Sequence, residues 1–165
     1  CTMAEIRLIR IDFRLIHGQV VTKWVKQANA DRIIIVNDAL AQDEFLGSVY
    51  KMAAPSDVRV SIFTIDKAIT KWEKNQFGEG NVLMLFKSVE DARSMQKRGF
   101  PMKALQIGGL GGGNGRVNTP SGISFDAKDA TLLKEIQNEG CEVYIHVVPS
   151  QQKYEINKVI ENLEF

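Results

Sequence analysis

The chain lacks the long apolar segments of membrane proteins and the clustered cysteines of small zinc-binding domains. Its apolar runs are short, as at 32–36 and 143–148, whereas a membrane-spanning helix needs about 20 apolar residues. It has only two cysteines, Cys1 and Cys141, and neither has histidines at metal-ligand spacing. We therefore expect no zinc site, and we expect Cys141 to be a small buried thiol in a strand.

An excess of charge of either sign is also missing. The 21 Lys and Arg residues nearly balance the 20 Asp and Glu residues, which argues against nucleic-acid binding and against an acidic tail. A length of 165 residues suits one domain with its own core. We expect that domain to span 1–165, with Cys1 and Thr2 as an expression remnant. The N-terminus alternates apolar and charged residues without a signal peptide, so the default expectation is a cytoplasmic protein.

Short apolar segments alternate with helical patterns along the chain. Helix caps are expected at Asp66, Ser88 and Asp126, and the last helix is expected to begin at Ser150. Because near-continuous apolar strands are usually buried on both faces, the pattern predicts an α/β fold. This would be a single three-layer domain with a mainly parallel sheet and helices on both faces. The expected strands are 6–11, 32–36, 58–64, 82–86, 103–107, 122–125 and 142–147.

The loop after the first strand carries the most reactive set of side chains. In open α/β sheets, ligands bind beyond the carboxyl ends of the strands. A neutral imidazole at His17 can act as a nucleophile near neutral pH, and Arg14 can offset the charge of a phosphoryl group. Asp12 can orient the imidazole or pair with an arginine. The helix start at Gly18 and Gln19 offers backbone N–H groups to an anion.

This loop resembles a known active-site signature. The stretch Arg10-Ile-Asp-Phe-Arg-Leu-Ile-His-Gly-Gln-Val, followed by Trp24, is similar to that of the IIB subunits of the mannose/fructose/sorbose class of the phosphoenolpyruvate-dependent sugar phosphotransferase system. The segment Gln106-Ile-Gly-Gly and the glycine run after it are also similar. One departure is Phe13, where a polar or acidic residue is expected in many members.

The resemblance implies a protein-phosphohistidine–sugar phosphotransferase that needs no cofactor or metal. His17 would take a phosphoryl group on Nδ1 from a phosphohistidine of a IIA domain or subunit. It would then pass the group to a sugar imported through the membrane subunits IIC and IID. Arg14 would assist the transfer, and Asp12 matches the aspartate of the signature. The protein would be cytoplasmic and peripherally associated with the membrane permease.

Several alternatives stay open at the level of the residues. His17 could be a packing residue, and the scaffold could serve a non-catalytic regulatory or small-ligand-binding module. A phosphatase or mutase-like enzyme is a third class. The glycine-rich segment 108–116 fits no dinucleotide or P-loop fingerprint, so it is expected to be a loop with several positive-φ glycines, with a phosphoryl contact as the alternative. His146 is expected to be a satisfied strand histidine. The sugar, the IIA partner and the oligomeric state, including a homodimer, are not fixed.

Overall fold

The computed structural model describes residues 4–111, 115–161 and 163, and it has a seven-stranded main sheet of order β3-β2-β4-β1-β5-β8-β9. Its strands pair in parallel except for β9, which runs antiparallel to β8. The strands are β1 (Glu5–Asp12), β2 (Arg32–Val36), β3 (Arg59–Phe63), β4 (Asn81–Phe86), β5 (Ala104–Gly109), β6 (Val117–Asn118), β7 (Ser124–Phe125), β8 (Glu142–Ile145) and β9 (Tyr154–Glu155). The helices are α1 (Gly18–Ala28), α2 (Asp38–Ala41), α3 (Glu44–Ala53), α4 (Ile65–Asn75), α5 (Val89–Lys97), α6 (Ala127–Asn138) and α7 (Ile156–Ile160).

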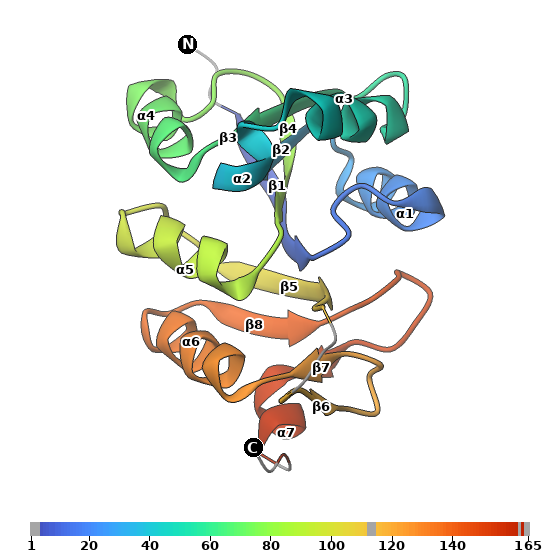
Figure 1. Ribbon diagram of the computed structural model, residues 1–165, viewed down its shortest axis with the longest axis vertical. Coiled ribbons are helices and arrows are strands. Elements are labelled where there is room, and N and C mark those ends of the chain that lie inside the picture. The colour runs from blue at the N-terminus through green and yellow to red at the C-terminus, as the bar shows by residue number, and fades with distance from the viewer. Residues whose placement is uncertain (1–3, 112–114, 162, 164–165) are drawn as a thin grey trace.

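Helices cover both faces of this sheet, which gives the three layers that the sequence predicted. Figure 1 shows α4, α5 and α6 along one side and α1 and α3 along the other. The strands contribute side chains to a hydrophobic core on each face of the sheet, because successive side chains point to opposite faces. In β2, for example, Ile34 and Val36 belong to the buried cluster that also contains residues of α4, α5 and α6, while Ile33 and Ile35 belong to the one that contains residues of α1. The apolar run of the strand is therefore explained by burial on both sides.

Helix caps explain most of the helix boundaries. The side chains of Ser88 and Asp126 accept hydrogen bonds from the backbone at the starts of α5 and α6, as predicted. The cap predicted at Asp66 is wrong. Thr64 caps α4, and its hydroxyl accepts from the Lys67 amide, so Asp66 lies inside the first turn. Both residue types are suitable caps, and the apolar Ile65 can occupy the first helical position.

The C-terminal part of the chain differs from the prediction in three places. The last helix begins at Ile156 rather than Ser150, because Tyr154 and Glu155 first pair with β8 as an edge strand. The strand expected at 122–125 is the short β7, and it pairs with β6 as a two-stranded ribbon. Among residues 108–116, Gly108 and Gly109 continue β5, while Gly115 has the expected positive φ of 80°. Residues 112–114, like Cys1 and Thr2, lie outside the described residues.

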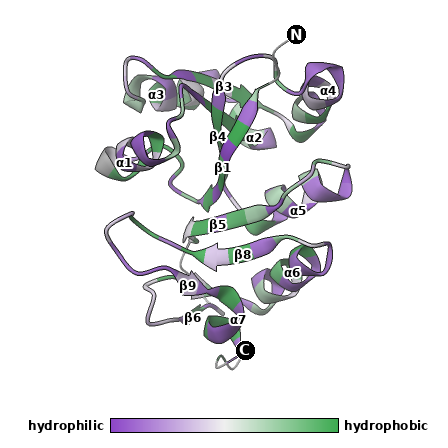
Figure 2. Cartoon of the chain, turned by 180° about the vertical axis from the view of Figure 1, so that it is seen from behind, coloured by the Kyte–Doolittle hydropathy of each residue, from purple (hydrophilic) through white to green (hydrophobic). Residues whose placement is uncertain are grey.

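Apolar surface is distributed unevenly over the molecule. Figure 2 shows hydrophobic residues along β5 and hydrophilic ones on α5, which is the usual division between sheet and helix. Helix α3 is different, because part of its apolar stripe faces outward. Phe45 and Met52 are exposed there, while Tyr50 packs against the core. Cys141 is buried as expected, and burial raises the pKa of its thiol to about 11. Within the described residues, no helix has the length and apolar character that crossing a bilayer requires.

Candidate active site

The polar loop after β1 lies at the middle of the carboxyl edge of the sheet. β1 is the central strand, with β4 on one side and β5 on the other. From β1 the chain enters α1, which belongs to one core, and from β5 it continues toward α6, which belongs to the other. Adjacent strands whose connections leave toward opposite faces form a crevice between their ends. The loop therefore occupies the position at which such sheets bind ligands.

The carboxylate of Asp12, the last residue of β1, holds the loop together. Its side chain is fully buried. Oδ2 lies 2.9 Å from Nε2 of His17. Arg14 donates from Nε to Oδ1 at 3.1 Å and from Nη2 to Oδ2 at 3.3 Å. The structure thus brings the three predicted side chains into contact. Asp12 contacts both the imidazole and an arginine, so the two arrangements that the sequence had left as alternatives occur together.

Asp12 is ionised at neutral pH even though it is buried. Burial acts to raise the pKa of this carboxyl, but hydrogen bonds from Arg14 and His17 and the charge of Arg10 outweigh it, so the pKa lies below its usual range. An ionised carboxylate can only accept hydrogen bonds. In the neutral form of the His17 ring, this contact places the proton on Nε2 and the lone pair on Nδ1.

Arg10 is the residue of this site that the sequence reasoning passed over. It donates from Nη2 to Oδ2 of Asp12 at 3.2 Å and is only 2% exposed. Nη1 also donates to the Gln106 side chain and to the carbonyl of His146. Nη2 reaches the carbonyl of Val147 at 2.9 Å, and the guanidinium lies 5.3 Å from the Trp24 ring. Arg10 therefore ties the ends of β1, β5 and β8 together. Its position two residues before Asp12, on the same side of a strand, is the signal that could have identified it.

Two glycines of β5 make room for this arrangement. A Cβ added at Gly108 would overlap the Arg10 guanidinium, and one at Gly109 would come within 3.0 Å of Oδ1 of Asp12. Gly109 also accepts a hydrogen bond from the Phe13 amide at 3.1 Å, which fixes the start of the loop. The glycines that end β5 are thus explained by close approach of charged side chains, and not by a phosphate-binding fingerprint.

Buried side chains fix the rest of the loop. Leu15 has a φ of 56°, which is uncommon for a leucine. Its side chain and that of Ile16 are buried against α1 and the sheet, and this packing holds the backbone in place. His17 precedes α1 as its N-cap without making a side-chain cap bond, and its side chain is 22% exposed. Gly18 and Gln19 are the first residues of α1, so their backbone N–H groups belong to an uncapped helix start.

Comparison with known proteins decides which family carries this site. The family model of the phosphotransferase-system sorbose subfamily IIB component matches residues 6–165. The chain belongs to this family. It is 34% identical over 161 residues to the sorbose-specific EIIB component of Klebsiella pneumoniae, covering 98% of both chains. It is 30% identical to the fructose-specific EIIB component of Bacillus subtilis, covering 98% of this chain and 99% of the other.

A solved structure confirms the fold of this IIB chain. The IIB domain of the sorbose permease of Klebsiella pneumoniae superposes with a TM-score of 0.91 at 34% identity, covering 98% of this chain and 99% of that one. The mainly parallel sheet with helices on both faces is therefore the fold of the family. The chain is a component of the sugar phosphotransferase system and belongs to the transferase class.

Replacing Gly108 tests whether the Arg10 cluster needs a residue without a Cβ. We expect Gly108→Ala to displace the guanidinium and to lower the free energy of unfolding by about 2 kcal/mol or more, since overpacking and a loosened buried ion pair add. Gly111→Ala is the matched control, because among the described residues a Cβ there meets only Phe13, at an ordinary 3.9 Å. Urea unfolding of both variants measures the difference. Equal stabilities would show that the cluster accommodates a side chain at Gly108.

Proposed function

We propose that His17 accepts a phosphoryl group on Nδ1 from the phosphohistidine of a IIA domain or subunit and passes it to a sugar. The observation that supports this most directly is the 2.9 Å contact between Nε2 of His17 and the buried Asp12. It occupies one ring nitrogen and leaves the other, on a partly exposed ring, with a lone pair for attack.

The first transfer balances as a displacement at phosphorus. The Nδ1 lone pair of His17 attacks, a P–N bond forms, and the P–N bond to the donor imidazole breaks with its electron pair returning to the donor ring. His17 keeps the proton on Nε2, so its ring becomes cationic while it holds the phosphoryl group. The ionised Asp12 stabilises that cation, because the two groups are already in hydrogen-bond contact.

The negative charge on the phosphoryl oxygens must be stabilised by hydrogen-bond donors that an incoming phosphoryl group can reach. Arg14 is suited to this role, because its side chain is 41% exposed even though its Nε and Nη2 groups donate to Asp12. The backbone N–H groups of Gly18 and Gln19 lie at the uncapped start of α1, a position suited to binding an anion, and the first turn of that helix contains no acidic residue. Together these groups replace the positive charge that a metal ion supplies in other phosphoryl-transfer sites.

The second transfer returns His17 to its starting state. A sugar hydroxyl oxygen attacks the phosphorus, the P–N bond breaks, and its electron pair returns to Nδ1. Nδ1 takes the hydroxyl proton and then releases it to solvent, which restores the neutral ring with its proton on Nε2. The acceptor sugar would be held by the membrane subunits IIC and IID. The protein would therefore work in the cytoplasm at the permease, and the choice of sugar would lie mainly outside this chain.

A labelling experiment tests the proposal. The chain is incubated with ³²P-phosphoenolpyruvate, enzyme I, the carrier HPr and a cognate IIA protein. We expect about one phosphoryl group per chain, labile in acid and stable in base, as a phosphoramidate should be. Two-dimensional ¹H–¹⁵N NMR of the imidazole identifies the modified nitrogen. Absence of label, or attachment at Nε2, would contradict the proposal. Rapid release of phosphate to water would favour a phosphatase.

A further inference from the structure

Phe13 presents an aromatic ring at the rim of the site. It follows β1 directly, next to the fully buried Asp12, yet it is 39% exposed. Among the described residues, the other exposed large apolar side chains all lie on α3. A single exposed apolar side chain is ordinary on a protein surface, but an aromatic ring at the rim of a polar site is also well suited to contact with another protein.

The Phe13 ring lies near Arg14 and Gly111. Its backbone amide is bonded to the Gly109 carbonyl, and the guanidinium carbon of Arg14 lies 5.5 Å from its ring centre. The backbone of Gly111 passes nearby, since a Cβ there would come 3.9 Å from the ring. A ring that already lies against neighbouring groups has less conformational entropy to lose when it is covered, which is a useful property in an interface anchor.

Phosphoryl transfer between two proteins brings their surfaces together at this rim. The phosphorus must come within bond-forming distance of Nδ1 of His17, so the donor protein must cover the residues around it. We propose that Phe13 is an apolar anchor for the phosphorylated IIA donor, an inference that rests on the proposed function. The donor accordingly carries an apolar surface patch beside its phosphohistidine. Aromatic residues buried at the centre of an interface contribute a large share of its binding energy.

Donor kinetics test this anchor. The rate of His17 labelling is measured against the concentration of phosphorylated IIA for the wild type, Phe13→Ala, Phe13→Leu and Phe13→Asp. We expect Phe13→Ala to raise the KM for the donor about tenfold and to leave kcat nearly unchanged. Phe13→Leu should restore part of the affinity because it remains apolar, and Phe13→Asp should be the weakest.

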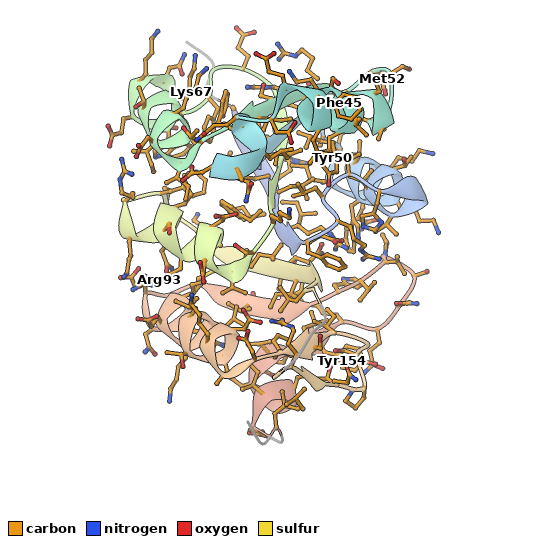
Figure 3. The ribbon with its side chains drawn as sticks, in the orientation of Figure 1. Phe45, Tyr50, Met52, Lys67, Arg93 and Tyr154 are labelled. Carbon is orange, nitrogen blue, oxygen red and sulfur yellow. The ribbon has the colours of Figure 1, made fainter. Side chains whose placement is uncertain are left out.

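Met52→Ala is the matched control. Met52 is 85% exposed, and Figure 3 shows it on α3, away from the central strand. Its removal tests whether loss of any exposed apolar side chain has the same effect. An equal KM for Phe13→Ala and Met52→Ala would overturn the anchor and leave the proposed function standing. A wild-type chain that takes no label from IIA would instead overturn the proposed function.

A small chemical donor separates docking from an effect on Arg14. Phosphoramidate has no protein surface, so its reaction with His17 depends on the site itself. We expect Phe13→Ala to lose much more with phosphorylated IIA than with phosphoramidate. Equal losses with both donors would show that Phe13 acts by holding Arg14 in place, and the docking role would then be wrong.

Discussion

His17→Gln should abolish incorporation of phosphate from the phosphorylated IIA protein, whereas His146→Gln should still reach about one phosphoryl group per chain. The chain contains only these two histidines, so the pair of variants assigns the acceptor. The structure explains the difference. The ring of His146 stacks edge-on against Trp24 at 4.8 Å, and its Nε2 is bonded to the carbonyl of Gln151 at 2.9 Å.

The measurement is the end-point label after complete transfer, with circular dichroism to show that both variants fold. Glutamine keeps much of the size and polarity of histidine but has no ring nitrogen to attack phosphorus. Because the carbonyl of His146 bonds Arg10 through the backbone, the substitution of its side chain retains that contact. Normal labelling of His17→Gln, or complete loss of label in His146→Gln, would show that the assignment of the acceptor is wrong.

Asp12→Asn should slow phosphorylation of His17 by about 100-fold or more. The amide is nearly isosteric but carries no charge, so it cannot stabilise the cationic ring. Its NH₂ group can also donate to Nε2 of His17, which would move the ring proton to Nδ1 and remove the attacking lone pair. In a serine protease triad the same exchange costs about 10⁴-fold for this reason. Rapid-quench labelling measures the rate, and ¹⁵N chemical shifts of the imidazole report the tautomer.

The same variant should lose stability, because it leaves the buried charge of Arg10 without its partner. We expect a loss of about 3 kcal/mol in the free energy of unfolding. Asp66→Asn is the matched control, since its ion pair with Arg98 is exposed and should change stability by less than about 1 kcal/mol. A fall in rate without a change in tautomer would confine Asp12 to charge stabilisation. An unchanged rate would show that Asp12 does not contribute to the phosphorylation of His17.

The pH dependence of stability has a definite sign. The folded-state pKa of Asp12 lies below the ordinary value of 3.8, so its contribution is present above that value and lost as the pH falls through the lowered pKa. In urea titrations the wild type should therefore approach the stability of Asp12→Asn in acid.

Local patterns in the sequence predict most of the sheet and half of the site. The apolar run at 32–36 matches β2 without correction, and the spacing of Asp12, Arg14 and His17 in one loop is enough to bring them together. These features depend on residues close in sequence, where side-chain direction and caps act.

Contacts between distant segments explain what the sequence did not predict. The role of Arg10 depends on carbonyls of His146 and Val147, which lie more than 130 residues away in the chain. The edge strand before α7 is similar, since residues 154–155 become a strand only because β8 offers them an unpaired edge. A helical pattern read from Ser150 cannot anticipate that competition.

The central place of β1 has a consequence for how the site behaves during thermal fluctuation. The C-terminal half of β1 is buried and paired on both sides, so we expect it to be among the last segments to open, whereas β3 and β9 lie at the edges of the sheet. Edge strands can fray and re-form without displacing the residue that anchors the imidazole. The proposed phosphoryl transfer at His17 would thereby be insulated from local unfolding elsewhere in the chain, because the loop that carries His17 is anchored to the interior through Asp12.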